Sequence, residues 1–324
     1  MKRIGLGIID VLISPFVLTG ALLFKRLRGR KFYLFPIARK IMFSVGVYPI
    51  NDYYYEPLFN PALLKESLRK DRALPGMDFN IEGQLQVLRS FDYNGELLEI
   101  PLKKKNSLDE LEYCYTEGPF QSGDAEYLYN MIRLYKPKKL IEIGSGYSTL
   151  LANKAINKNI QEMGGAICNH ICVEPYENKW LEKLGIEIIR KKVEDIEVDY
   201  FKQLGKDDIL FIDSSHMIRP QGDVLFEYLN LLPILNTGVI IHIHDIFTPK
   251  DYLNEWIDKS IFWNEQYLLE AFLSHNKDFE IIGATNFLLH NHRNEFYEKC
   301  PIIKMQIESG VPREPGSFWI RKIN

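Results

Sequence analysis

Cysteine is scarce in this chain of 324 residues, which contains only Cys114, Cys168, Cys172 and Cys300. Four scattered cysteines are too few for a disulfide framework, and no second pair accompanies Cys168 and Cys172 to complete a zinc site. We interpret them as ordinary thiols of a reducing compartment. The protein is therefore expected in the cytoplasm.

Net charge is also low, at −3, because 40 Lys and Arg balance 43 Asp and Glu. A protein that binds nucleic acid mainly through charge is normally basic, so we expect no nucleic-acid partner. Disorder requires low hydrophobicity together with high net charge, whereas 46% of these residues are hydrophobic. The sequence has no internal repeat and no low-complexity tract.

The small net charge conceals an uneven distribution along the chain. Residues 1–50 contain nine Lys or Arg and a single acid, a balance of +8, whereas the remainder carries −11. Within the basic part, residues 4–24 read IGLGIIDVLISPFVLTGALLF, 21 residues with one charge. As a helix this run would be about 31 Å long, enough to cross the hydrocarbon core of a bilayer.

Two residues of this run argue against a simple transmembrane span. Asp10 would cost about 2.5–3.5 kcal/mol near the bilayer centre, and Pro15 interrupts the helical hydrogen-bond ladder. Basic residues flank both ends, so charge gives no orientation, and no small-residue cleavage site of a secretory signal follows. We favour residues 4–31 as a helix on the inner face of the membrane, bound to anionic headgroups. A single span, and a helix packed on the protein itself or in a dimer interface, remain open.

The rest of the chain divides into an extension and a regular α/β region. Residues 32–110 lack a glycine-rich motif and are predicted as mixed helix and loop, with a helical stretch over Pro61–Lys70, covering a substrate site. Residues 111–324 alternate short β-branched runs with helical stretches, as in parallel α/β sheets. The predicted strands are Lys139–Gly144, His170–Glu174, Glu187–Val193, Asp208–Asp213, Gly238–Asp245, Phe279–Phe287 and Ser317–Lys322. We predict a doubly wound, mostly parallel seven-stranded sheet that finishes in a hairpin, with an N-terminal helical extension of residues 1–31 and 32–110.

A glycine-rich turn follows the first predicted strand. The run LIEIGSGYSTLLANKAI leads from the strand through Gly144, Ser145 and Gly146 into a helix, which brings free N–H groups close to a ligand. The dinucleotide fingerprint would require glycine at Thr149. Glu142, two residues before the first glycine, could instead accept hydrogen bonds from a cationic amino group.

An acid ends the second predicted strand. Glu174 follows the run ICV, and a carboxylate in this position can accept hydrogen bonds from both hydroxyls of a ribose. The alternative is that this acid only caps the next helix.

These motifs together resemble the class I S-adenosylmethionine-dependent methyltransferases, in particular bacterial O-methyltransferases of sugars and other small molecules. The resemblance implies that Glu142, Gly144, Ser145, Gly146 and Glu174 bind the cofactor S-adenosylmethionine. It also implies an acid near the adenine after the third strand, where this chain has Glu194 and Asp195. Either of these two residues fits that role.

The fourth and fifth strands end in polar residues. DILFIDSSHMIRPQGD places Asp213 and His216 after one apolar strand, in a pattern that looks like the D-x-x-H element of bacterial small-molecule O-methyltransferases. GVIIHIHDIFTP places His242, His244 and Asp245 at the end of the other, with the two histidines on one face. Since unpaired buried polar groups are costly, we expect these residues to share a site.

Two chemical roles remain open for this cluster. Asp213 and Asp245, with or without His244, could bind Mg²⁺ that lowers the pKa of a substrate hydroxyl. Metal-dependent relatives usually have Asp-Asn where this chain has His244-Asp245, which argues against a metal. Alternatively, His216 or His244 acts as a general base without metal, because imidazole titrates near neutrality.

The leading hypothesis is therefore an S-adenosylmethionine-dependent methyltransferase that modifies a hydroxyl of a sugar, a glycolipid or another small polar acceptor. The segments HIHDIF and GSFWIRK resemble segments of methyltransferases that are encoded with surface-polysaccharide genes. Two alternatives are an NAD-dependent oxidoreductase on a similar sheet and a non-catalytic membrane-bound scaffold. The oligomeric state is open, and a homo-oligomer is compatible with the sequence.

Overall fold

The computed structural model describes residues 2–29, 32–53, 55–104, 109–165, 168–176 and 178–324. The chain divides into two compact units, Met1–Ser67 and Leu68–Asn324. Arg30 and Lys31 of the predicted membrane-binding segment lie outside the described residues. The predicted boundary at residue 110 does not coincide with this division, because residues 68–110 belong to the larger unit.

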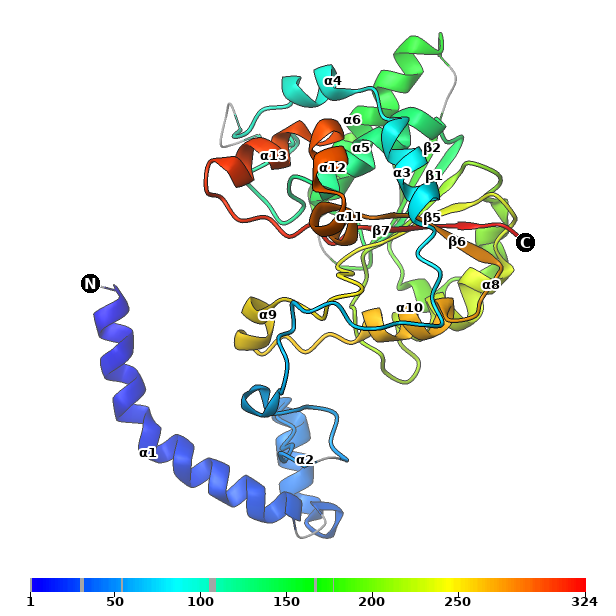
Figure 1. Cartoon of the computed structure of the whole chain (residues 1–324). Coiled ribbons are helices and arrows are strands. Elements are labelled where there is room, and N and C mark those ends of the chain that lie inside the picture. Colours follow the sequence, from blue (N-terminus) through cyan, green and yellow to red (C-terminus); the bar gives the residue numbers. More distant parts are fainter. Residues whose placement is uncertain (1, 30–31, 54, 105–108, 166–167, 177) are drawn as a thin grey trace. The chain divides into compact units, whose positions relative to one another are not determined.

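The first unit is built on one long helix. It contains α1 (Lys2–Gly29), the 3₁₀ turn η1 (Phe32–Leu34), α2 (Pro36–Val45) and η2 (Pro61–Leu63). Helix α1 continues through Pro15, so the proline does not end it, and the helix is curved along its length (Figure 1). By length and composition alone, Leu6–Gly29 is sufficient to cross a membrane, and no part of its apolar window is buried.

The predicted helical stretch Pro61–Lys70 is wrong. Only η2 is helical there, with the side chain of Asn60 accepting the N–H of Ala62 at 3.1 Å. The next residue, Leu64, is extended with ψ of 129°, which ends the turn.

The second unit contains the predicted seven-stranded sheet. Its strands are β1 (Lys139–Ile143), β2 (Asn169–Val173), β3 (Glu187–Ile189), β4 (Ile209–Ile212), β5 (Ile240–Ile243), β6 (Phe279–Ala284) and β7 (Phe318–Lys322). Their order is β3-β2-β1-β4-β5-β7-β6. Strands β1 to β5 are parallel, and β7 runs antiparallel between β5 and β6. The all-parallel order 3-2-1-4-5-6 of dinucleotide-binding sheets has no such inserted strand, which argues against the oxidoreductase alternative.

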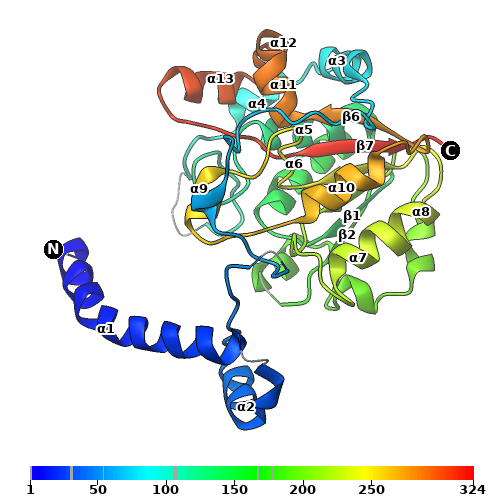
Figure 2. The same cartoon turned by 60° about the horizontal axis from the view of Figure 1, so that its bottom comes forward.

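Helices cover both faces of this sheet. The α-helices are α3 (Ile81–Arg89), α4 (Asn94–Glu99), α5 (Asp124–Tyr135), α6 (Tyr147–Glu162), α7 (Asp223–Phe226), α8 (Leu232–Ile234), α9 (Asn254–Asp258), α10 (Glu265–Leu273), α11 (Thr285–Asn291), α12 (Arg293–Lys299) and α13 (Pro301–Glu308). A π-helical turn, η6 (Glu227–Leu231), joins α7 to α8. Figure 1 places α3, α5, α6 and α11 to α13 on one side of the sheet and α8 and α10 on the other, and Figure 2 turns the second side forward.

Two hydrophobic cores result, one on each face. The first joins α3, α5, α6 and α11 to α13 to side chains such as Leu140 and Trp319. The second joins α7, α8 and α10 to side chains such as Ile141 and Ile212. Because both faces are covered, β4 is a continuous apolar run, and Glu142 and His242 are buried polar residues within β1 and β5. This packing fixes the positions at which the strands end.

The predicted strands differ from the observed ones mainly at their carboxyl ends. Gly144, Glu174, Asp213 and Asp245 each lie one or two residues beyond the observed strand. The last three residues of the predicted strand Phe279–Phe287 belong instead to α11. The polar residues of interest therefore lie on loops at one edge of the parallel sheet, where open α/β sheets bind their ligands.

Candidate active site

The glycine-rich turn brings β1 and β4 together. Gly144 has φ of +77°, and a Cβ on it would lie 1.8 Å from the carbonyl oxygen of Asp213. Any larger residue would therefore displace the backbone of the neighbouring loop. Immediately after the turn, α6 starts at Tyr147, so its free N–H groups face the same edge of the sheet.

Thr149 and Glu142 hold this turn from behind. The hydroxyl of Thr149 accepts the N–H of Gly146 at 3.0 Å and donates to Glu142 Oε2 at 2.8 Å. The other carboxylate oxygen of Glu142 contacts Nε2 of His170 on β2. Only 1% of the surface of Glu142 is exposed, so this carboxylate stabilises the turn from within the protein. A direct contact between Glu142 and a cofactor remains a prediction. Glycine at position 149 would remove this hydroxyl, which explains the departure from the dinucleotide fingerprint.

Glu174 follows β2 and connects to the same turn. Its Oε2 accepts the N–H of Ser145 at 3.2 Å, and its Oε1 accepts the N–H of Tyr176 at 3.0 Å. The residue lines two adjoining cavities, of about 990 and 410 Å³. Glu194 lines the smaller cavity, whereas Asp195 is exposed and is not among its lining residues. Of these two predicted residues, Glu194 is therefore the better placed.

The larger cavity joins the glycine turn to the predicted acid–histidine cluster. Gly144, Ser145 and Gly146 line one part of it, and Asp213, His216, His244 and Asp245 line another. Within the cluster, His216 Nε2 lies 3.2 Å from Asp213 Oδ1 and 3.6 Å from Asp245 Oδ2. The sequence thus correctly predicted that these strand ends meet.

His216 is held from its other side by a residue that the sequence analysis missed. Its Nδ1 lies 2.8 Å from Glu265 Oε2, and Glu265 is completely buried and also accepts the hydroxyl of Tyr228 at 3.0 Å. Glu265 stands at the start of α10, 49 residues from His216 in sequence. No short motif links the two, so only the fold brings them together.

The charges in this cluster shift its pKa values in opposite directions. Burial lowers the pKa of His216, but the hydrogen bonds to Asp213 and Glu265 and the charge of Asp245 outweigh burial and raise it well above its ordinary value. Burial raises the pKa of Asp213, but His244 and His216 outweigh it and lower that pKa to about 2. Burial raises the pKa of Asp245. The two carboxylates on one side of His216 and Glu265 on the other thus favour its protonated form, and His216 can act as a base or a metal ligand only in its neutral form.

The backbone at the cluster is strained. His216 has φ of +57° and Asp245 has φ of +58°, both in the left-handed region that favours glycine. Such conformations cost about 1–3 kcal/mol each and persist mainly at functional sites. Two such residues, with side chains 3.6 Å apart at the lining of one cavity, support a functional role for this pair.

The donor atoms of the cluster suit a divalent cation. One ligand atom each from Asp213, His216 and Asp245 lies within 4.8 Å of the others. Two carboxylates and an imidazole are ligands for ions such as Mg²⁺, Mn²⁺ or Zn²⁺. The contact between Glu265 and Nδ1 of His216 is the carboxylate–histidine arrangement that orients metal-binding histidines. His216 rather than His244 completes this set.

The two histidines of β5 lie on one face, as predicted, but differ in their surroundings. His242 stacks on Phe211 with ring centroids 4.1 Å apart, and its Nε2 lies 2.9 Å from Ser317 Oγ. Burial lowers its pKa well below the ordinary value, so His242 is a neutral core residue. His244 Nε2 lies 3.5 Å from Asp245 Oδ1. Burial lowers the pKa of His244, but Asp245 and Asp213 outweigh it and raise that pKa.

Aromatic side chains form one wall of the larger cavity. Trp263 lies beside His216, with ring centroids 4.3 Å apart, and packs edge-on against Trp256 at 4.8 Å. Both tryptophans are half-buried and line the cavity. This aromatic segment therefore borders the site and is not confined to the core.

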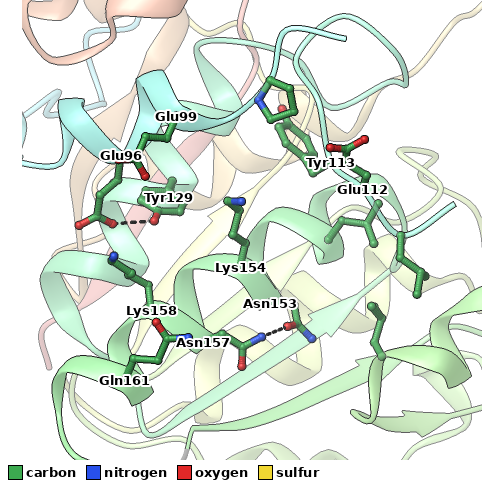
Figure 3. A pocket seen from close by; sticks show the side chains of 14 residues that line it. Glu96, Glu99, Glu112, Tyr113, Tyr129, Asn153, Lys154, Asn157, Lys158 and Gln161 are labelled. Atoms are coloured by element: carbon green, nitrogen blue, oxygen red, sulfur yellow. Dashed lines mark hydrogen bonds between the residues drawn. The ribbon is translucent and has the colours of Figure 1, made fainter. Parts of the chain in front are cut away.

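A separate cavity of about 440 Å³ lies between α6 and the segment around α4. Figure 3 shows Lys154 and Lys158 of α6 at this cavity, together with the hydrogen-bonded pairs Glu96–Tyr129 and Asn153–Asn157. None of the predicted site residues lines it. The cofactor turn and the acid–histidine cluster belong to the other two cavities.

Comparison with known proteins identifies the central part of the sheet. Residues 141–246 match the family model described as a methyltransferase domain. An uncharacterized protein of Archaeoglobus fulgidus is 29% identical over 161 residues, which are 48% of this chain and 68% of that protein. The plantazolicin methyltransferase BpumL, solved in complex with SAH, is 14% identical and covers 75% of this chain and 96% of its own. The TM-score between the two structures is 0.36.

Proposed function

We propose that this chain is a class I S-adenosylmethionine-dependent methyltransferase that methylates a hydroxyl group of a sugar, a glycolipid or another small polar acceptor. The match of residues 141–246 to a methyltransferase domain supports this proposal. One observation carries this proposal. The acid–histidine cluster of Asp213, His216 and Asp245 lines the same cavity as the glycine turn, so a hydroxyl can lie between the cofactor and the groups that activate it.

The chemistry at this cavity is a single displacement. The methyl group leaves the sulfonium sulfur of S-adenosylmethionine for the acceptor oxygen, the sulfur becomes a thioether, and the hydroxyl proton passes to a basic group. Rate then depends on holding the acceptor oxygen in line with the methyl group. Gly144 and Glu174 position the cofactor side, and the cluster positions the acceptor side.

We assign to the cluster a divalent cation, with Mg²⁺ as the first candidate. Asp213 and Asp245 would supply carboxylate oxygens, and His216, oriented by Glu265, would supply a nitrogen. Such a cation lowers the pKa of a hydroxyl bound to it. His244, beside Asp245 in the same cavity, is the residue placed to receive the proton.

Two features support the proposed class of acceptor: the residues that line the cavity and the N-terminal helix. Trp256 and Trp263 offer apolar ring faces beside polar groups, a combination that suits the faces and hydroxyls of a sugar. The predicted membrane association of residues 4–31 supports an acceptor at the inner face of the membrane, such as a glycolipid. A free sugar and a lipid-linked sugar are separated by the experiment below.

Two experiments test the proposal. Calorimetry measures binding of S-adenosylmethionine to the full chain, and mass spectrometry compares extracted glycolipids, polysaccharides and free sugars from cells with and without the protein for a difference of one CH₂. A Gly144→Val variant must lose cofactor binding, because its side chain would overlap the Asp213 carbonyl. If this variant keeps full cellular function, the protein is a scaffold instead of an enzyme.

The metal assignment has its own test. Chelation should abolish turnover and added Mg²⁺ should restore it, and Asp245→Asn should raise the Mg²⁺ concentration needed. Full turnover in the presence of chelator would contradict the cation and leave metal-free base catalysis by His216 or His244.

A further inference from the structure

Helix α2 carries an apolar stripe that the described part of its unit leaves uncovered. Ile37, Ile41 and Val45 recur every four residues, so they lie on one face of the helix. Their exposed fractions are 76%, 57% and 72%. Isolated exposed aliphatic residues are ordinary on a protein surface, but an aligned row is typical of a contact face.

The helix itself is well defined. Pro36 occupies its first turn, and Gly46, with φ of +78°, ends it, where the N–H groups of Gly46 and Val47 return to carbonyls of the last turn. Met42 is buried, and so is Phe32 in the preceding turn. The helix therefore packs through Met42 and holds the stripe away from that contact.

A side-chain pair fixes the end of α1 in the same unit. Arg28 donates to both carboxylate oxygens of Glu56, at 2.9 and 2.7 Å. Bidentate pairs of this kind set geometry as well as charge. Of the basic residues of α2, Arg39 lies over the ring of Phe43, 5.0 Å from its centroid, and Lys40 is exposed.

The charge around the stripe indicates the nature of that partner. Arg39 lies on the side of α2 away from the stripe, Lys40 flanks the stripe, and both are exposed. The sequence has no acidic residue between Asp10 and Asp52. A helix with an aliphatic face, a basic remainder and no acids fits the surface of a bilayer that contains anionic lipid.

We propose that α2 docks in the headgroup region of an anionic bilayer through Ile37, Ile41 and Val45. With 10 residues at about 1.5 Å each the helix is too short to span the hydrocarbon core, so it lies in the interface. Val47 and Tyr48 are also exposed just beyond its end, where Tyr48 packs against Phe43. This inference rests on the proposed membrane association of residues 4–31 and adds a second, independent contact, which stable anchoring generally requires.

Hydrogen exchange of the full chain tests the proposal, with vesicles of phosphatidylcholine and phosphatidylglycerol as the probe. We expect the amides of residues 36–47 to exchange at least about tenfold more slowly with vesicles than without. The variant Ile37→Gln/Ile41→Gln/Val45→Gln should lose this slowing, because glutamine keeps helix propensity but removes the apolar face. A matched control, Leu98→Gln/Met163→Gln/Leu229→Gln, alters exposed apolar residues of the other unit and should keep it.

The outcomes separate this inference from the proposed function. If residues 6–29 are slowed by vesicles but residues 36–47 are not, the α2 contact is wrong and the α1 contact stands. If neither segment is slowed, both are wrong. Exchange of residues 36–47 could instead slow as protein concentration rises, without any lipid. That result would show that the stripe contacts a second copy of the chain, and it would overturn the proposal.

Discussion

Among single residues, His216 has the most specific surroundings in the candidate site. It lies between Asp213 and Asp245 on one side and Glu265 on the other. Glu265 contacts the ring from outside the cavity wall, so it is a positioning residue. Its carboxylate selects which nitrogen of His216 faces the cavity.

We predict that Glu265→Gln lowers methyl-transfer turnover by about 10- to 100-fold, the usual cost of losing such a supporting carboxylate. The KM for S-adenosylmethionine should change little, because Glu265 does not contact the glycine turn. Steady-state kinetics with a thermal melt of the same sample measure this. Tyr228→Phe removes the other hydrogen bond of Glu265 and should have a smaller effect. Wild-type turnover in Glu265→Gln would show that His216 needs no such support.

Thr149 is the second residue whose role is specific. Its hydroxyl links the N–H of Gly146 to the carboxylate of Glu142. We expect Thr149→Val, which keeps the shape but removes the hydroxyl, to weaken S-adenosylmethionine binding by about tenfold, because two buried polar groups lose a partner. Thr149→Ser keeps the hydroxyl and should bind nearly as well as the wild type. Calorimetric titration decides the matter, and equal affinities for Val and Ser would contradict this role.

At the scale of elements, α5 is held to α13 by one buried carboxylate. Glu126 accepts the N–H groups of Ile302 and Ile303 at 2.7 and 3.0 Å and that of Gly123 at 3.0 Å. Burial raises its pKa from 4.5 to about 7, although the three N–H groups lower it in part. The folded state therefore binds a proton that the unfolded state has already released between these two pH values.

This linkage predicts a decline in stability as pH rises. Glu126 contributes about 3 kcal/mol to the free energy of unfolding. This contribution is fully present below the pKa of Glu126 in the unfolded state, and it is lost as pH rises through the pKa of Glu126 in the folded state. Urea unfolding between about pH 5 and 8 should show the decline, and Glu126→Gln should flatten it. The variant should also be less stable throughout by about 1–3 kcal/mol, because its amide faces N–H donors. Exposed Glu308→Gln is the control, and a wild-type slope in Glu126→Gln would refute the assignment.

The sequence predicted the elements well because the central strands are apolar on both faces. A run such as Ile209–Ile212 between polar flanks has few other structures available. The turn at Gly144 and the acids at the strand ends could be predicted for the same reason, since parallel strands end at one edge. The predicted helix Pro61–Lys70 was wrong because the chain leaves the 3₁₀ turn at Leu64 in an extended conformation, and the side chain of Arg69 instead reaches Asp251 and Glu314, far away in sequence.

The partners within the site could not be predicted from sequence. Glu265 reaches His216 only because α10 packs below β4 and β5, which no local pattern specifies. The contact of Glu142 with His170 on the neighbouring strand is of this kind, while its contact with a cofactor stays a prediction. Residue type and strand position can be predicted from sequence, whereas side-chain direction depends on which strand lies alongside.

For the whole molecule, the important asymmetry is electrostatic. The first fifty residues carry +8 and the remainder −11. An anionic membrane therefore attracts residues 1–50, which include α1 and α2, and repels the acidic remainder of the chain. The same distribution predicts that binding to vesicles depends on salt and on anionic lipid and is localised to the basic unit.

We predict that Arg26→Gln/Arg39→Gln/Lys40→Gln weakens binding of the full chain to phosphatidylglycerol-containing vesicles by about 100-fold, since each basic group near such a surface contributes about 1 kcal/mol. All three side chains are exposed, so their replacement should leave folding unchanged. Vesicle co-sedimentation across a salt series measures the affinity. Lys206→Gln/Lys277→Gln/Lys304→Gln changes the net charge equally on exposed sites of the acidic unit, and binding of this variant should stay close to wild type. Equal losses in the two variants would mean that total charge governs binding, so attraction would not be localised to the unit of α1 and α2.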